Sequence, residues 1–489
     1  MLGAALRLAG IGWGVPRYDG GLGQGTALRT SYHLDEDKVL WPLALGREQR
    51  SYWGAPTTHL TRAALWVAER TGALGGPWRR AFLEPTSRLR AVFVSGRLLS
   101  VAFALGTIAI VWAWARGRAG DAAGTVAATL LAVSPLHVVH AHFLTPDAAL
   151  AFWITLSLWL LERGTSLCSP GTARTAALGA HRAFGALPPD PQVWGGLALG
   201  LALATKASAL FALPALLFLP RRRALAAAAV ALGAALGDPT LLLHAREGIT
   251  GLFHQTGAGG PLDALKMLVF QGWQIAYYGL GVVGLAAALG GLRCAPRGTR
   301  WALAALFLSL GLSRIPVARY ALPLLPVLAV EAGVMFAAVP LRWRLPAAAA
   351  ALLPPLVLAA GQAGLLAGEH TAQRAGDWIA EHAPPGATVA QVWPEYPLLD
   401  ARHVVPVPLY TRSTAPAGGP GLAADFVVLD GLRLEPFTAG TRDALARGYE
   451  EVASFTRPPH LGPLVLPEPW PAHDWKYTHP ALEVWRRVR

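Results

Sequence analysis

The chain has 489 residues, of which 53% are hydrophobic and only 15% are charged, and its mean hydropathy is +0.39. Because soluble domains carry about 25% charged residues, this composition excludes an ordinary soluble protein. The formal net charge is +13, but the arginines gather in short loops between apolar runs, where they set membrane topology, so we expect no nucleic acid partner. With two cysteines, Cys168 and Cys294, the sequence has no disulfide framework and no cysteine-based metal spacing.

The amino-terminal part is predicted to be a short apolar segment followed by a polar loop. Met1 to about Pro16 is too short to span a bilayer comfortably and lacks a signal-peptide cleavage site, so it is either a marginal helix or the end of a segment that starts upstream. The loop covers about residues 17–90 and contains Asp35 and Glu36. Apolar residues recur at helical spacing over 57–71, which predicts a helix lying in the membrane interface.

Apolar runs of membrane-spanning length follow from about residue 90 to about residue 366, which is typical of an all-α polytopic membrane protein. Placing the arginine-rich loops in the cytoplasm puts the amino terminus inside and the carboxyl end outside. This orientation requires residues 193–219 to form a hairpin of two short helices with Lys206 at its outer tip. Residues 238–270 are mixed in character and are expected at the interface. The total is about eleven transmembrane segments. The predicted spans after the first segment are Ala91–Ala115, Ala122–Val139, Ala148–Leu161, Val193–Leu219, Ala224–Leu236, Trp273–Leu292, Trp301–Leu312, Tyr320–Val339 and Leu345–Leu366.

The composition changes near Glu369, which predicts a membrane domain over 1–368 and a small extracytoplasmic α/β domain over 369–489. A turn is expected at residues 384–386, where two prolines precede a glycine. Apolar periodicity predicts the helices and strands of this second domain. They are helices at Thr371–His382 and Thr441–Arg447 and strands at Ala387–Val392, Phe426–Leu429 and Leu482–Val488.

The predicted topology puts a one-sided set of ionisable residues at the outer membrane face. Such residues are costly near a membrane and mark function more often than chance, so we expect a polar cavity that opens outward. A pore would need polar lining through its full depth, and a secondary transporter usually has internal repeats, of which the sequence shows none clearly. The set is Asp35, Glu36, His137, His140, His142, Asp147, Lys206, Arg314 and Arg319.

Six blocks, taken in order, resemble GT-C class glycosyltransferases of the dolichyl-phosphate-mannose:protein mannosyltransferase superfamily, glycosyltransferase family 39, whose bacterial relatives include the aminoarabinose transferases that act on lipid A. The resemblance covers nearly the whole chain, although Leu34 stands where the family usually has a proline. The blocks are Tyr32–Glu36; Ser134–His137 with His142-Phe143 and Thr145–Asp147; Ala204–Ala209; Arg319–Pro326; Arg374–Ile379 with Pro384–Ala387; and Asp425–Asp430.

The resemblance implies a GT-C fold and transfer of a sugar from a polyprenyl-phosphate donor to an acceptor hydroxyl, at the outer side of the inner (plasma) membrane. Asp35 matches the family's catalytic carboxylate and is the candidate base for the acceptor proton. Because an ordinary aspartate is weakly basic, we expect burial beside Glu36 and Asp37 to raise its proton affinity by like-charge repulsion. The alternative is that Asp35 only binds a metal or the acceptor.

Three cations are candidates for a clamp on the donor phosphate. Arginine forks suit phosphate oxygens and lysine supplies a point charge, so we assign this role to Lys206, Arg314 and Arg319. Tyr320 adds a hydroxyl donor. The alternative is that the two arginines only anchor the chain at the membrane interface.

Asp147 is the second acidic candidate, and two interpretations stay open. It is either the N-cap of the next helix or a ligand, together with His142, for a sugar hydroxyl or a metal. His137, His140 and His142 invite a zinc interpretation, but they form no fixed ligand set in the sequence. A divalent metal therefore stays open and no cofactor is assigned.

Two other functional classes compete with the transferase. A transporter or flippase for a lipid-linked sugar also needs an outward polar cavity, and a binding or scaffold protein could keep the fold with a decayed catalytic loop. Because Asp35 and Glu36 are both retained, the sequence argues against decay. The expected partners are a polyprenyl-phosphate sugar, a hydroxyl-bearing acceptor and the lipid bilayer.

Overall fold

The structure is a computed structural model, and its chain divides into two compact units. The first contains Met1–Leu8, Gly46–Ala63 and Arg97–Ala360, and the second contains Ala9–Leu45, Ala64–Gly96 and Gly361–Arg489. The residues that the structure describes are 1–15, 31–33, 35–46, 54–83, 88–166, 190–219, 223–240, 260–313, 315–391, 404–408, 423–431 and 441–488.

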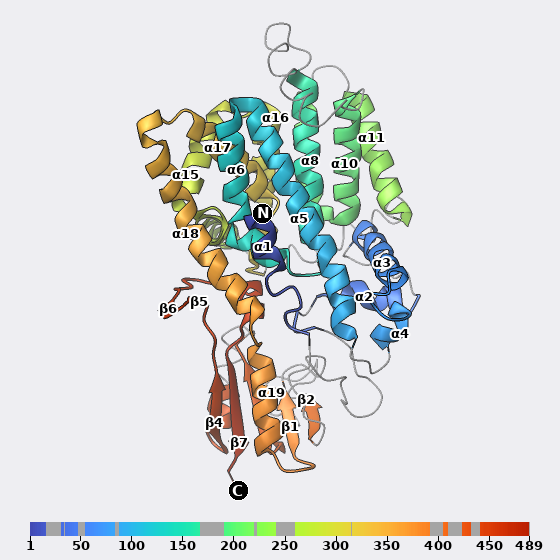
Figure 1. Ribbon diagram of the computed structural model, residues 1–489, viewed down its shortest axis with the longest axis vertical. Coiled ribbons are helices and arrows are strands. Elements are labelled where there is room, and N and C mark those ends of the chain that lie inside the picture. The colour runs from blue at the N-terminus through green and yellow to red at the C-terminus, as the bar shows by residue number, and fades with distance from the viewer. Residues whose placement is uncertain are drawn as a thin grey trace. The chain divides into compact units, whose positions relative to one another are not determined.

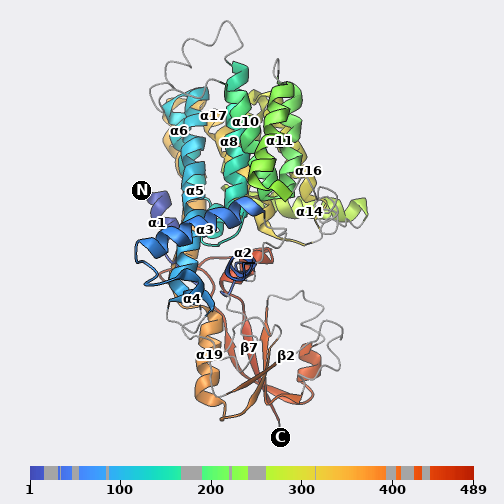
Figure 2. The ribbon, with the colours of Figure 1, turned by 90° about the vertical axis from the view of Figure 1, so that its right-hand side faces the viewer.

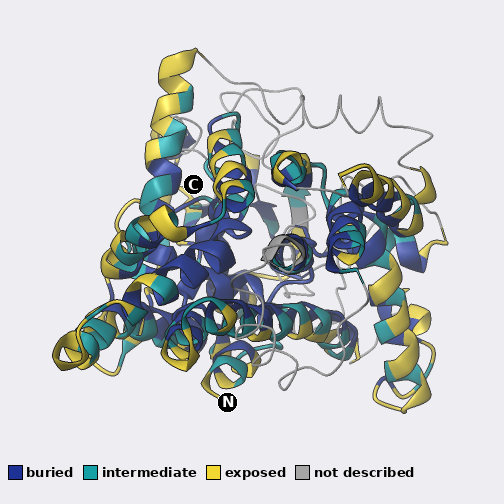
Figure 3. Cartoon of the chain, turned by 90° about the horizontal axis from the view of Figure 1, so that it is seen from above, coloured by how far each residue is buried: buried dark blue, intermediate teal, exposed yellow. Residues whose placement is uncertain are grey.

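The first unit consists of packed helices, with α8, α10 and α11 side by side (Figure 1). Figure 3 shows exposed residues, in yellow, along many of the helices, and many large apolar residues are among the exposed ones, as a surface that faces lipid requires. The described helices from the amino terminus to residue 367 are α1 (Leu2–Leu8), α2 (Asp37–Ala44), α3 (Ala55–Arg70), α4 (Trp78–Leu83), α5 (Leu89–Ala119), α6 (Asp121–Ala132), α7 (Pro135–His140), α8 (Asp147–Ser166), α10 (Pro191–Thr205), η1 (Ala207–Phe218), α11 (Arg223–Gly237), α14 (Pro261–Gln274), η2 (Ile275–Gly279), α15 (Gly281–Gly291), η3 (Leu292–Cys294), α16 (Arg297–Leu310), η4 (Ala318–Ala321), α17 (Leu324–Ala337) and α18 (Leu341–Ala367).

Within the described residues, two helical stretches are long and apolar enough to cross a membrane, Leu89–Ala119 and Leu341–His382. A third qualifies if the bent pair Pro261–Gly279 and Gly281–Cys294 counts as one span. Several predicted spans correspond to shorter apolar helices, so the number of eleven remains a prediction. These shorter helices are Asp121–Ala132, Ala207–Phe218, Arg223–Gly237 and Leu324–Ala337.

Two predicted spans are wrong as single helices. The span Ala122–Val139 breaks after α6, because Ser134 caps a new helix, α7, and Pro135 has no N–H to continue the earlier one. The span Trp273–Leu292 begins earlier, at Pro261, and bends by 113° around Gly281, whose φ of +74° suits glycine. Both breaks lie inside apolar sequence, where hydropathy gives no warning.

The interruption predicted at Lys206 is confirmed. Helix α10 ends at Thr205, the 3₁₀ helix η1 begins at Ala207, and Lys206 between them has extended backbone angles (φ −161°, ψ 130°). Glycine allows α10 to approach α11 closely. A Cβ added at Gly200 would lie 2.2 Å from the carbonyl oxygen of Val230, so no side chain fits there. Small residues allow such close approach between helices in a membrane.

The amino-terminal segment forms α1, which is anchored by a buried arginine. Arg7 donates to the carbonyl oxygens of Gly3 and Ala132 (both 2.9 Å) and of Leu131 (3.2 Å), and to Nδ1 of His137 (2.6 Å). The last carbonyl groups of a helix have no partner inside the helix, so Arg7 satisfies those of α6. Tertiary contacts therefore hold this short helix.

The second unit contains a five-stranded sheet in the order β2-β1-β3-β7-β4, with α19 (Thr371–His382) packed against β4 and β7 (Figure 2). β1 is parallel to β2 and β3, whereas β7 is antiparallel to β3 and β4. A hairpin of β5 and β6 is separate. The strands are β1 (Thr388–Gln391), β2 (Val405–Pro408), β3 (Phe426–Asp430), β4 (Tyr449–Phe455), β5 (His460–Leu461), β6 (Leu464–Val465) and β7 (Leu482–Arg487), and a 3₁₀ helix, η7, covers Asp474–Thr478.

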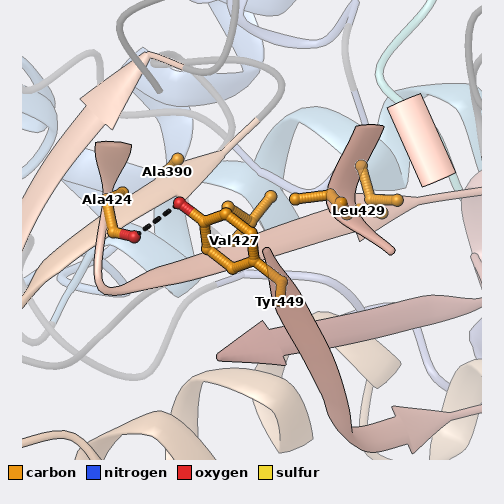
Figure 4. Packing of buried hydrophobic residues seen from close by; sticks show 6 residues of the cluster. Ala390, Ala424, Val427, Leu429 and Tyr449 are labelled. Carbon is orange, nitrogen blue, oxygen red and sulfur yellow. Dashed lines mark hydrogen bonds between the residues drawn. The ribbon is translucent and has the colours of Figure 1, made fainter. Parts of the chain in front are cut away.

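The small α/β part predicted at the carboxyl end is confirmed. Helix α19 has the predicted bounds, and β1, β3 and β7 match the three predicted strands to within two residues. The predicted helix at 441–447 covers residues 441–445. β2, β4 and the β5–β6 hairpin were not predicted. Between the sheet and residues 441–445 lies a core of Ala390, Ala424, Val427, Leu429, Leu445 and Tyr449 (Figure 4), in which the Tyr449 hydroxyl donates to Ala424 O at 2.7 Å.

Candidate active site

A buried ion pair is the centre of a polar cluster in the first unit. Lys206 Nζ donates to Asp147 Oδ1 at 2.8 Å, and the Asp147 and Lys206 side chains are 1% and 18% exposed. Asp147 is the first residue inside α8, so it is not the N-cap residue. Its second oxygen, Oδ2, is buried without a hydrogen-bond partner among the described residues. A buried acid is thus tied to a cation 59 residues away in the chain.

Two further predicted residues join this pair from η4. Lys206 Nζ lies 4.8 Å from the centre of the Tyr320 ring, a cation–π contact that involves the ring face. Arg319 is 9% exposed, and its charge acts on the Asp147 carboxylate. Gln271 Nε2 donates to Val317 O at 2.9 Å and so holds the chain that leads into η4. Counting the lysine, the arginine and the aspartate, the cluster carries one net positive charge.

The three histidines occupy separate environments in the first unit. His137 Nδ1 accepts from Arg7, His142 Nδ1 contacts Val138 O at 2.9 Å, and the His140 ring meets Phe143 edge-on at 5.7 Å. All three are buried. Among the residues that the structure describes, no three His, Cys, Asp or Glu side chains gather as metal ligands. The zinc interpretation therefore has no geometric support here.

The first-loop acids belong to the second unit, where each has a close partner. Lys38 Nζ donates to Asp35 Oδ1 at 2.5 Å, and the Asp35 side chain is 7% exposed. Glu36 Oε2 accepts from the Ser31 hydroxyl. The expected like-charge repulsion on Asp35 is thus opposed by a cation, which favours the ionised carboxylate. Lys38 was not predicted as a site residue, although its i,i+3 spacing from Asp35 was a usable signal.

His370, at the start of α19, connects this helix to the last part of the chain. Its Nδ1 accepts the Ala372 backbone N–H at 3.1 Å, and its Nε2 lies 3.1 Å from Tyr477 O. Because Nδ1 is an acceptor, the ring proton belongs on Nε2, which donates to the carbonyl. The imidazole is 4% exposed and held from both sides.

The first loop packs on this histidine. The Tyr32 ring stacks on His370 at 4.4 Å with an interplanar angle of 10°, and Trp13 meets His370 edge-on at 5.2 Å. The His33 ring meets Tyr477 edge-on at 5.2 Å, and His33 Nδ1 accepts the Asp35 backbone N–H at 3.2 Å. Aromatic contacts with the carboxyl-terminal segment therefore support the loop that carries Asp35. No pattern in the sequence indicated this packing.

Arg314, the third predicted cation, lies outside the described residues, so its role remains a prediction.

No protein-family model matches the chain, and no curated protein matches it in sequence. Among solved structures, ArnT from Cupriavidus metallidurans bound to undecaprenyl phosphate is similar, with a TM-score of 0.51 and 14% identity over 98% of this chain and 96% of that chain. The apo state of the same protein has a TM-score of 0.48 and 15% sequence identity, and the match covers 99% of this chain and 93% of that chain. The oligosaccharyltransferase AglB from Archaeoglobus fulgidus, solved in complex with an inhibitory peptide and a dolichol-phosphate, has a TM-score of 0.45 and 14% sequence identity. That match covers 87% of this chain and 69% of that chain.

The likeness to ArnT shows that this chain has the same fold along nearly its whole length. That fold is the GT-C fold of membrane glycosyltransferases, which confirms, for the fold, the resemblance seen in the sequence.

Proposed function

We propose that this protein is a membrane glycosyltransferase that moves a sugar from a polyprenyl-phosphate-linked donor to an acceptor hydroxyl. The observation that carries the proposal is the buried Asp147–Lys206 pair with Arg319 and Tyr320 beside it. This cluster is net positive and occurs in a chain with the fold of ArnT, a protein solved with undecaprenyl phosphate bound. A lipid phosphate is the ligand that such a group suits.

In this proposal, Lys206 and Arg319 bind the donor phosphate, with Arg314 as a third cation. Negative charge grows on the phosphate as its bond to the sugar breaks, and fixed cations stabilise that charge. Lys206 is held between the Asp147 carboxylate and the Tyr320 ring, so little reorganisation is needed. Tyr320 and His142 complete the proposed substrate-binding set.

The acceptor side of the reaction is assigned to Asp35. The acceptor oxygen forms a bond to the anomeric carbon, the bond from that carbon to the phosphate oxygen breaks, and polyprenyl phosphate leaves with the bonding electrons. The acceptor proton passes to Asp35, which Lys38 holds in place. Glu36, bound to the Ser31 hydroxyl, shapes the same loop.

We place the reaction at the outer face of the inner (plasma) membrane, with 1–368 as the membrane domain and 369–489 as an extracytoplasmic domain. The support for this orientation is the distribution of arginines among the loops between apolar runs.

The test uses purified protein in nanodiscs, a polyprenyl-phosphate sugar labelled in the sugar, and a panel of hydroxyl acceptors. Release of polyprenyl phosphate together with a labelled acceptor supports the proposal. Movement of intact donor across a vesicle bilayer, without release, would identify a transporter or flippase instead. Mass spectrometry of cell-envelope glycans with and without the gene identifies which sugar and acceptor belong in the assay.

A further inference from the structure

The first unit contains a pocket near the end of α8, far from the Asp147–Lys206 pair at its start. Its volume is about 350 Å³, and it is lined by α8, η1, the start of α11 and the start of α16. Glu162 is its residue on α8, fifteen positions after Asp147, which corresponds to roughly 22 Å along the helix. The pocket is therefore separate from the candidate active site.

Two arginines from different helices give this pocket a positive charge. Arg297 has no ion pair or hydrogen bond within the described residues, and Arg223 uses only Nε, which donates to Leu219 O at 2.6 Å. Glu162, the one acid among the described lining residues, already has Arg118 at 3.6 Å and accepts from the Thr299 hydroxyl at 3.4 Å. Two guanidinium groups are therefore left to bind an anion.

Aromatic and apolar side chains beside this pocket fit a position at the level of lipid headgroups. Phe218, which lines it, stacks parallel to Trp301, with ring centres 6.4 Å apart and an interplanar angle of 5°. Trp301 is 59% exposed and Leu217, in the lining, is 65% exposed. Tryptophan is enriched where a membrane helix meets the headgroup layer, and apolar side chains beyond it face acyl chains. The pocket thus joins a cationic end to an apolar wall.

We propose that this pocket binds an anionic membrane phospholipid, with its phosphate on Arg223 and Arg297 and an acyl chain against Leu217 and Phe218. Basic pockets between membrane helices bind anionic headgroups in this way. A zwitterionic lipid is disfavoured because its ammonium group would lie beside two guanidinium groups. Both arginines come from loops that the sequence predicts to be cytoplasmic, the side where anionic lipids attract basic residues.

The experiment measures phosphatidylglycerol and phosphatidylcholine retained by the purified full chain, using native mass spectrometry after reconstitution from an equal mixture. The wild type is expected to retain phosphatidylglycerol preferentially. The double variant Arg223→Gln/Arg297→Gln should lose this preference by about tenfold for each charge-assisted contact removed. Arg342→Gln, an exposed arginine on α18, is the matched control and should behave as the wild type.

The proposal is overturned if the wild type and the double variant retain phosphatidylglycerol equally, or if the wild type does not prefer phosphatidylglycerol to phosphatidylcholine. If the double variant does not fold, Arg297→Gln alone decides the outcome, because this exposed residue has no partner to lose among the described residues. Displacement by soluble glycerol phosphate alone would indicate a simple anion site and would also overturn the lipid assignment. None of these measurements depends on glycosyl transfer.

Discussion

Breaking the Asp147–Lys206 pair should destabilise the protein unequally, depending on which partner is removed. Lys206→Met leaves a carboxylate that is 1% exposed and already has one oxygen without a partner. Removing one member of a buried pair costs about 3–5 kcal/mol, so we expect about 3 kcal/mol for this variant. Asp147→Asn leaves a lysine that is 18% exposed and still lies over the Tyr320 ring, so we expect only about 1–2 kcal/mol.

The double variant Asp147→Asn/Lys206→Met removes both members of the pair, so neither is left as an unpaired buried charge. Its loss of stability should therefore be smaller than the sum of the single losses by about 1–3 kcal/mol, the usual coupling between residues in contact. The assay is reversible unfolding in mixed detergent micelles, followed by circular dichroism. Lys266→Met is the control, because its pair with Asp263 is 3.5 Å long and more than half exposed on both sides. That variant should change stability by less than about 1 kcal/mol.

Additive single losses would refute this reasoning, and so would a larger loss for Asp147→Asn than for Lys206→Met. Additive losses would mean that the two side chains do not depend on each other in the folded protein. A larger loss for Asp147→Asn would mean that the burial of the partner left behind does not determine the loss of stability.

Four further predictions concern the proposed reaction and its orientation. Asp35→Asn should lower turnover by about 10²–10⁴-fold with donor binding kept; near-normal turnover would remove this residue as the base. Arg319→Lys should raise the donor KM more than the acceptor KM, because lysine cannot form a forked contact with phosphate; an unchanged donor KM would make the arginine an anchor only. An impermeant thiol reagent should label Arg447→Cys in intact cells but not the exposed native Cys294, and the reverse pattern would invert the topology. His370→Ala should increase deuterium exchange over residues 31–44 and lower kcat, with partial rescue by His370→Gln; unchanged exchange would contradict its support of the first loop.

Strong local patterns in the amino-acid sequence were enough to predict several helices and strands. The amphipathic run Thr371–His382 became α19 with the predicted bounds, and the apolar run Phe426–Leu429 became β3. The polar Lys206 inside an apolar stretch also predicted the break between α10 and η1. These features depend on neighbours in the chain, and a pattern of neighbours is what a sequence records directly.

Features that join distant segments depend instead on tertiary contacts. β4 has the polar sequence Tyr449–Phe455 and becomes a strand because it pairs with β7. The break at Ser134 and the bend at Gly281 lie in runs that stay apolar on both sides, so hydropathy could not locate them.

In the candidate site, too, the sequence predicted the residues but not the contacts between them. Residue types and topology pointed to Asp147, Lys206 and Arg319 as functional, but the ion pair and the contact with Tyr320 depend on how α8, η1 and η4 pack. The partner of Asp35 could have been read from its spacing to Lys38, whereas the packing of Tyr32 on His370 could not. The contact between Asp147 and Lys206 joins residues 59 positions apart, and the stacking of Tyr32 on His370 joins residues more than 300 apart, so only the packing of the folded chain brings them together.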